Sequence, residues 1–164
     1  MAPLYQAFSQ ALPTTAAPVK VATGTAIKTL MQVAVPSGIT IRVVEWGISL
    51  DTPASASIVA VELVQTDVAA STGTSFTPMG LNQDGLGSAS GCVGGTALTC
   101  YQPTAEGTIT ATREFDTKLL APPYDYVKQF PLGREPSVPV SRFLRVRVTA
   151  SVTCNAYAYI VWEE

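Results

Sequence analysis

The sequence predicts an all-β protein, namely an antiparallel β-sandwich with jelly-roll connectivity, about eight strands and an extended N-terminal arm. Two observations predict this fold. Apolar and polar residues alternate in several stretches, and turn signals containing proline or glycine separate those stretches. Almost no stretch repeats its apolar residues at helical spacing. With 164 residues the chain has the size of one domain with its own core, and a β-barrel is the alternative architecture.

Residues 1–24 are predicted to form the arm, and residues 25–164 the single β-sandwich domain. Leu4, Phe8 and Leu12 repeat at helical spacing and precede a Thr/Ala/Pro tract that cannot hold a regular element. So short a segment offers no partner for these apolar side chains. The arm is therefore expected to fold back on its own domain, to lie on a neighbouring subunit or to remain a disordered tail.

Three stretches of period two follow the arm and predict three successive strands. Between proline-containing turns, they span residues 26–35, 39–50 and 57–66. In the second stretch the apolar positions are odd up to Val43 and even from Val44, which places apolar residues on both faces and predicts a central strand. In the third, Val59, Val61 and Leu63 share the face expected to meet the core.

The middle of the chain has the weakest pattern. Residues 67–108 are rich in Gly, Ser, Thr and Ala, and short strands are expected near 75–81 and 97–102. The chain then continues with an alternating stretch, an extended proline-punctuated stretch and two strong strands, at 108–120, 121–140, 143–152 and 156–164.

The strand at 143–152 alternates clearly between apolar and charged residues. Leu144, Val146 and Val148 are predicted to face the core, and Arg145 and Arg147 to face outward.

The residue types needed for common catalytic chemistry are missing. The chain has no histidine, which excludes Ser-His-Asp and Cys-His catalysis and most first-row metal sites. No glycine-rich segment has the context of a P-loop or a dinucleotide-binding turn. We therefore predict a protein that is not an enzyme, with no catalytic residue, no cofactor and no metal site.

Carboxylates are the remaining candidates for chemistry. Glu45 and Glu62 lie in predicted central strands and could form a glycosidase pair, but such a carboxylate more often pairs with an arginine such as Arg42, Arg145 or Arg147. Four others lack the ordered spacing of a calcium loop and are expected to be solvated: Glu106, Glu114, Asp116 and Asp125.

The composition limits the kinds of binding partner and the cellular compartment that are expected. The net charge of −2 and the scattered basic residues argue against nucleic acid, and no apolar run approaches the roughly 20 residues of a membrane helix. The N-terminus lacks the basic start and apolar stretch of a signal peptide, so synthesis in a cytoplasm is expected. Only 13% of residues are charged, and a surface of Thr, Ser, Ala and Gly suits burial by neighbours. Cys92 and Cys100 are either a disulfide or two free buried thiols, and Cys154 has no predicted partner.

Several strings in the predicted strands resemble a known class of protein. They are EWGISLD (45–51), VELVQT (61–66), FPLGREP (130–136), LRVRVTA (144–150) and CNAYAYIVWEE (154–164). They resemble small β-rich proteins encoded among the structural genes of tailed bacteriophages, in particular capsid decoration, or cement, proteins. The resemblance spans most of residues 20–164. It implies a virion protein on the capsid exterior that stabilises capsomer contacts, made in the host cytoplasm, whose partners are the major capsid protein and copies of itself in a homotrimer.

That implied function suggests which residues make contact. Leu4, Tyr5, Phe8 and Leu12 would anchor the arm, and Arg134 and Glu135, in a predicted turn after a glycine, would pair charges at a subunit contact.

The alternative function is a lectin-like adhesion module that binds a host surface or a glycan. It requires an exposed aromatic platform, for which Tyr124 and Tyr126 are the candidates. Aromatic residues at strand spacing, as here and at Tyr157, Tyr159 and the two tryptophans, more often serve as core or interface anchors.

Overall fold

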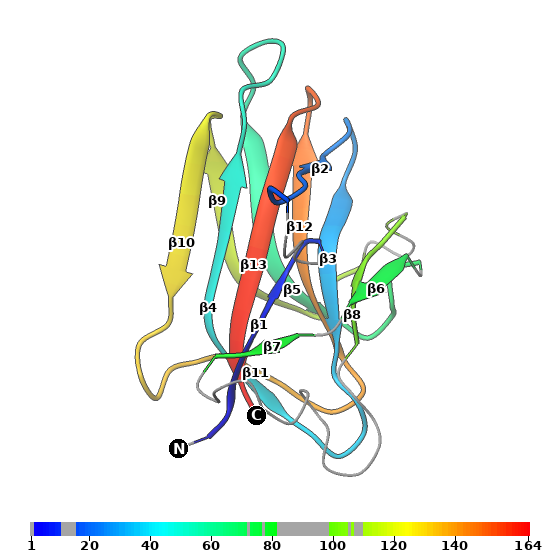
Figure 1. Ribbon diagram of the computed structural model, residues 1–164, viewed down its shortest axis with the longest axis vertical. Helices are drawn as coiled ribbons and strands as arrows, with labels where there is room; N and C mark the ends of the chain where they lie inside the picture. The colour runs from blue at the N-terminus through cyan, green and yellow to red at the C-terminus, as the bar shows by residue number, and fades with distance from the viewer. Residues whose placement is uncertain are drawn as a thin grey trace.

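The computed structural model describes residues 2–10, 16–71, 73–76, 78–81, 99–104, 106 and 110–164. Within these residues the regular elements are strands, and they form two antiparallel sheets that pack face to face (Figure 1). The predicted all-β sandwich is confirmed. Jelly-roll connectivity stays a prediction. None of the described segments is a helix with the length and hydropathy to cross a membrane.

Sheet A, in front in Figure 1, has the strand order β10-β4-β13-β1-β7, with β11 paired to β4 and β2 paired to β13. Its strands are β1 (Leu4–Phe8), β2 (Val21–Ala22), β4 (Ile41–Leu50), β7 (Met79–Gly80), β10 (Tyr124–Gln129), β11 (Ser137–Val138) and β13 (Asn155–Glu163).

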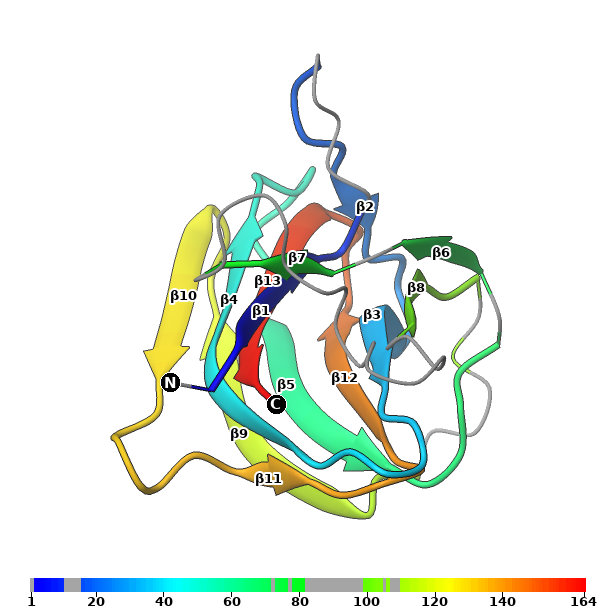
Figure 2. The ribbon, with the colours of Figure 1, turned by 60° about the horizontal axis from the view of Figure 1, so that its bottom comes forward.

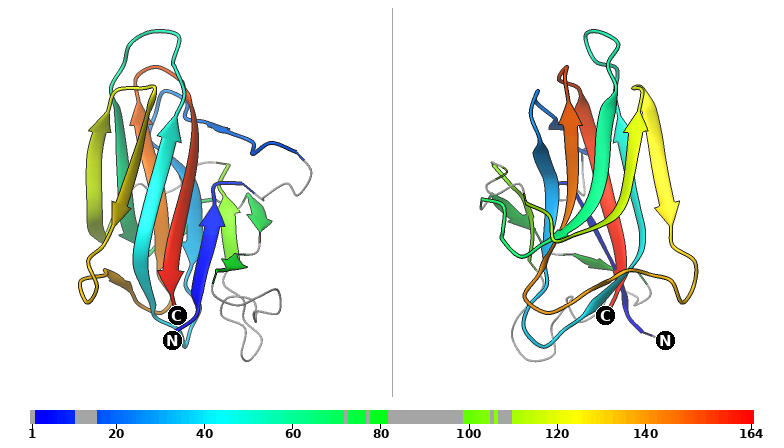
Figure 3. Two further views of the ribbon diagram at one scale, coloured as in Figure 1. Left: turned by 60° about the vertical axis from the view of Figure 1, so that its left-hand side comes forward. Right: turned by 180° about the vertical axis from the view of Figure 1, so that it is seen from behind.

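Sheet B has the order β6-β8-β3-β12-β5-β9 and lies behind sheet A (Figure 3). Its strands are β3 (Lys28–Ala34), β5 (Val59–Thr66), β6 (Thr74–Phe76), β8 (Thr99–Gln102), β9 (Arg113–Leu120) and β12 (Phe143–Ala150). Short strands were predicted near 75–81 and 97–102, and β6, β7 and β8 confirm them.

The core fills the space between the two sheets, which Figure 2 shows from one end. Sheet A contributes Trp46 and Trp162, both fully buried. Sheet B contributes the alternating Val and Leu side chains of β5 and β12. The predicted inward faces of these two sheet B strands are confirmed. Their apolar burial is the main driving force for the fold.

Strand β4 is central, as predicted, but its apolar residues do not lie on both faces, which was the reason for that prediction. Residues Glu45 and Val43 of β4 pair with the consecutive residues Val161 and Trp162 of β13, so Val44 is an extra residue in β4. Such a bulge shifts the alternation by one position. Side chains on odd positions before the bulge and on even positions after it therefore all point into the same core: Ile41, Val43, Trp46, Ile48 and Leu50.

Arg145 and Arg147 point away from the core, as predicted, yet they are not solvent-exposed. Arg145 is 0% exposed and Arg147 is 6% exposed. The backbone around Val68 and the side chain of Glu106 contact Arg145 on the outer face of sheet B. The alternation of apolar and charged residues predicts the direction in which a side chain points, but not which other segments of the chain cover it.

The start of the predicted arm is a strand of the sandwich. β1 pairs with β13 from Leu4 opposite Glu163 to Phe8 opposite Tyr159. Residues 4–8 therefore form a strand and not a helix, so the helical interpretation of the Leu4 and Phe8 spacing is wrong. Of the three alternatives for the arm, folding back on its own domain holds for these residues. Residues 16–20 are exposed, and this stretch stands away from sheet A ahead of β2 (Figure 3, left).

Candidate interaction surfaces

The residues predicted to anchor the arm divide between the two faces of β1. Tyr5 is 2% exposed and stacks on Trp162, with ring centroids 6.2 Å apart, so it belongs to the core. Leu4 and Phe8 lie on the opposite, outer face and are half-buried. Leu12 lies outside the described residues. The structure thus brings Phe8, but not Tyr5, to a surface.

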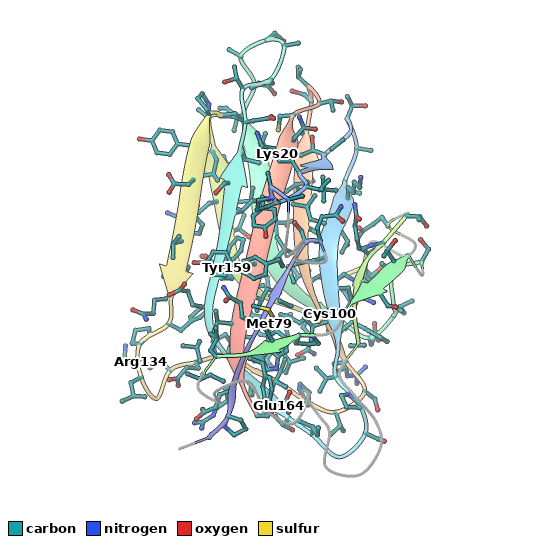
Figure 4. The ribbon with its side chains drawn as sticks, viewed as in Figure 1. Lys20, Met79, Cys100, Arg134, Tyr159 and Glu164 are labelled. Carbon is teal, nitrogen blue, oxygen red and sulfur yellow. The ribbon has the colours of Figure 1, made fainter. Side chains whose placement is uncertain are left out.

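Phe8 is part of an aromatic cluster on the outer face of sheet A. Its ring stacks on Tyr157 with centroids 5.6 Å apart and is tilted against Tyr159 with centroids 6.2 Å apart. All three side chains are half-buried. In Figure 4, Tyr159 lies in front of β13.

The register of the strands extends this cluster across the sheet. Phe8 lies opposite Tyr159, Tyr159 opposite Gly47, and Gly47 opposite Val127. These four residues form one row across β1, β13, β4 and β10. Met79 of β7, paired with Gln6, lies on the same face and is exposed. We call Phe8, Tyr157, Tyr159, Val127 and Met79 the aromatic face.

Gly47 lets Tyr159 lie flat on the sheet. A Cβ atom at Gly47 would lie 2.4 Å from Cε1 of Tyr159, which is closer than two non-bonded carbon atoms can approach. The ring covers the space where a side chain would otherwise stand. Tyr159 also donates a hydrogen bond of 2.5 Å from its hydroxyl to Oε1 of Glu45. Burial, together with this bond and the charge of Glu45, raises the pKa of Tyr159 well above its ordinary value.

A second exposed feature is the turn that follows β10. The backbone N–H of Arg134 donates to the carbonyl of Pro131 at 2.8 Å, and Gly133 has φ of 79°. A glycine with positive φ at the third position is typical of a type II turn. The turn presents Leu132, which is 98% exposed, next to Arg134 and Glu135. Arg134 is the last residue of this turn and follows the glycine, as predicted, whereas Glu135 lies just after the turn; Figure 4 shows Arg134 beyond the end of β10.

The predicted aromatic platform at β10 is not formed. Tyr124 is 65% exposed, but Tyr126 packs edge-on against Trp46 with centroids 5.5 Å apart. The hydroxyl of Tyr126 donates to Oδ2 of Asp116 at 2.8 Å, and Nε1 of Trp46 donates to the same oxygen at 3.1 Å. Burial and the neighbouring carboxylate raise the pKa of Tyr126 to about 12. Asp116, predicted to be solvated, instead joins the two sheets.

Glu45 and Glu62 do not form a catalytic pair. Glu45 points outward from sheet A toward Tyr159, whereas Glu62 points outward from sheet B and pairs with Arg147, with Oε2 and Nε 3.3 Å apart. The whole core lies between the two carboxylates. The prediction that a strand carboxylate pairs with an arginine is confirmed at Glu62, and Arg42 pairs with Glu163 at 2.5 Å.

A buried polar cluster occupies the outer face of sheet B over β3 and β12. Nη1 of Arg145 lies 2.9 Å from Oε1 of Glu106, and Nε of Arg145 donates to Oε1 of Gln32 at 3.0 Å. The same Gln32 oxygen accepts a bond of 2.9 Å from the backbone N–H of Ala70. Thr29 donates to Oε2 of Glu106 at 2.5 Å.

This cluster fixes the chain's own loops to sheet B. Two connections that are distant in sequence from β12 supply its partners. The carbonyl of Val68 and the carboxylate of Glu106 accept hydrogen bonds from Arg145, and the backbone N–H of Ala70 donates to Gln32. Glu106 was expected to be solvated, but its side chain is 8% exposed. Its partners are protein groups in fixed positions, and the arrangement is that of a structural cluster.

The cysteines offer no reactive thiol in the described part of the chain. Cys100 and Cys154 are free and buried, and burial raises the pKa of both. Cys92 lies outside the described residues, so the predicted alternatives for its pairing are not decided. Across the residues that are described, no group of three His, Cys, Asp or Glu side chains is arranged to hold a metal ion.

Comparison with known proteins gives no relative from which a function could be transferred: no family model, no curated protein and no solved structure matches this chain. Within the described residues the candidate surfaces are the aromatic face, the Leu132 turn and the edge strand β10, which ends the strand order of sheet A.

Proposed function

We propose that this protein is a non-enzymatic virion structural protein that binds the exterior of a phage capsid through the aromatic face of sheet A and stabilises capsomer contacts. The observation that carries the proposal is the contrast between the outer faces of the two sheets. Phe8, Tyr157 and Tyr159 are stacked and half-buried on sheet A, while the chain closes sheet B over β3 and β12 with its own loops.

The chemistry of the aromatic face suits a protein partner. Stacked tyrosine and phenylalanine rings give large contact area at small conformational cost, and such residues are enriched among binding anchors. The Leu132 turn adds an exposed apolar tip held by a hydrogen bond. The low charge of the chain reduces the desolvation cost of covering its surface. The resemblance to decoration proteins supplies the identity of the partner, a phage shell.

The experiment is co-sedimentation of the chain with capsids assembled without it. The proposal expects saturable binding, and Tyr157→Ser should weaken it at least about tenfold, the loss typical of an interface anchor. The matched control is Leu119→Ser, which removes an exposed apolar side chain from the outer face of sheet B and should leave binding unchanged.

Three outcomes would overturn the proposal. The first is an absence of capsid binding by the unmodified chain. The second is an equal effect of the two substitutions. The third is adsorption to host cells that is lost in Tyr124→Ser, which would instead support the lectin-like adhesion module.

A further inference from the structure

We propose that β10 is a self-association edge, at which two copies of the chain pair antiparallel about a twofold axis through Val127 and join their aromatic faces into one surface. β10 ends the strand order of sheet A, and Figures 1 and 3 show no described strand beyond it. The pairing does not depend on capsid binding, and its test uses the protein alone.

The backbone of β10 leaves a defined set of groups available. The N–H of Phe130 donates to the carbonyl of Val44 at 2.9 Å, so Phe130 and the even-numbered residues before it form the hydrogen-bonded pairs with β4. In an antiparallel ladder such pairs alternate with pairs that are not bonded. The N–H and C=O groups of Asp125, Val127 and Gln129 therefore point outward from the edge, and the described residues provide them with no backbone partner.

These outward groups match a second copy of themselves. When two β10 strands run antiparallel with Val127 opposite Val127, the available groups of Asp125 face those of Gln129 in the other copy. Because opposite residues share a face, the two sheets A continue into each other with their aromatic faces on the same side.

The side chains select this register among its neighbours. On the outer face Val127, which is 54% exposed, meets its own copy, and Asp125 meets Gln129. On the other face Lys128 meets the ring of Tyr126, whose hydroxyl is bonded to Asp116. A twofold axis through Lys128 or Asp125 would oppose like charges, and one through Tyr126 would leave Asp125 facing Val127. Of these four axes, the one at Val127 is the one that opposes no like charges between the two β10 strands and places Asp125 opposite a polar side chain.

The pairing extends the row of Phe8, Tyr159, Gly47 and Val127 directly into its copy, because Val127 is the last residue of that row. Two aromatic faces held side by side bind a repetitive lattice more tightly than one. A twofold contact closes on itself and produces a dimer. It therefore differs from the homotrimer implied by the resemblance to decoration proteins.

Light scattering over a range of concentrations tests the pairing. The unmodified chain should reach twice the mass of one chain, and Val127→Lys, which places two like charges opposite each other at the axis, should raise the dimer dissociation constant at least about tenfold. Val140→Lys is the matched control, since it changes an exposed valine away from β10 and should leave the dimer intact.

Cross-linking tests the register. Cα atoms of a bonded antiparallel pair lie about 5.5 Å apart, within reach of a disulfide. Val127→Cys should form a covalent dimer on mild oxidation, whereas Asp125→Cys, which is not opposite itself, should cross-link no faster than the parent chain. A monomer at every concentration, a trimer, or equal cross-linking by the two cysteine variants would overturn the proposal.

Discussion

The outer faces of the two sheets differ in how far the chain itself covers them, although both carry side chains that are unusual on a solvent-exposed sheet. On sheet B, Arg145, Gln32 and Glu106 form a buried cluster that fixes the chain's own loops in place. On sheet A, Phe8, Tyr157 and Tyr159 stack on one another and remain half-buried. The charged groups of Arg145 and Glu106 on sheet B find their partners within the chain, and the aromatic face is the one suited to a partner.

The chemistry of the two faces explains this division. A buried guanidinium needs several fixed acceptors, and only groups of the same folded chain are always present to supply them. Aromatic rings tolerate partial exposure before a partner arrives, because the tyrosine hydroxyl is their only polar group and it can bond to water or to the protein. Tyr159 has already bonded its hydroxyl to Glu45. The aromatic face can therefore stay open in the free protein.

The largest expected effect comes from breaking the sheet B cluster. Arg145→Ala should lower the free energy of unfolding by about 3–5 kcal/mol, because it leaves the buried carboxylate of Glu106 without its main partner. Urea denaturation measures this loss. Arg142→Ala is the control, since its pair with Asp67 is exposed and 3.9 Å long, and it should cost less than about 1 kcal/mol. Equal losses in the two variants would show that the cluster does not hold sheet B closed.

The next effect separates the two faces of β1. Tyr5→Ala removes a buried ring stacked on Trp162 and should cost about 3 kcal/mol of unfolding free energy. Phe8→Ala removes a half-buried ring from the aromatic face and should cost about 1 kcal/mol. Thermal or urea unfolding compares the two. Capsid co-sedimentation below the unfolding transition should detect a defect in Phe8→Ala, and a larger binding defect in Tyr5→Ala would contradict the assignment of faces.

Gly47→Ala alters the aromatic face without removing any ring. The added Cβ would displace Tyr159 from its position over the sheet and disrupt its bond to Glu45, at a cost of about 2 kcal/mol. Gly80→Ala is the control, because its nearest contact would be 4.0 Å away at Cε1 of Tyr5. The midpoint temperature of thermal unfolding and the affinity for capsids should both fall in Gly47→Ala, and neither should fall in Gly80→Ala. If binding is unchanged despite the lost stability, the position of Tyr159 does not matter for the partner.

The smallest expected effect is a pH dependence at Asp51, away from both faces. Asp51 accepts bonds from the backbone N–H and the side-chain amide of Asn155, at 2.7 and 2.8 Å, and these lower its pKa below 3.8. A carboxyl with a lowered folded pKa stabilises the protein above the unfolded pKa and loses this contribution as pH falls through the folded value. Asp51→Asn should therefore be less stable than the parent chain at pH 7, and the difference should shrink below pH 4. A difference that does not change with pH would exclude this contribution.

The sequence predicts the sandwich well because alternation is a local signal. The inward faces of β5 and β12 follow directly from Val59, Val61 and Leu63 and from Leu144, Val146 and Val148. The bulge at Val44 could not be predicted, because an extra residue and a strand with two apolar faces produce the same pattern. The register with β13 distinguishes the two.

The candidate surfaces depend on contacts between distant segments, which no single stretch encodes. Leu4 and Phe8 are four residues apart, a spacing that suits one face of a helix and also one face of a strand, so the period of β1 was ambiguous. The aromatic face needs β1, β13, β4 and β10 side by side. The burial of Arg145 needs Val68 and Glu106. The glycine at 47, opposite Tyr159 in a strand otherwise free of glycine, is the one local signal that could have marked the face.

Hydroxyl-radical footprinting of the chain bound to capsids tests most directly whether the aromatic face is the binding surface. The rate of side-chain oxidation would be compared between free and bound protein on both sheets. We predict that binding protects Phe8, Tyr157 and Met79 on sheet A and leaves the oxidation of Leu119 on sheet B unchanged. Protection of Leu119 with unchanged oxidation of the aromatic face would contradict the central claim.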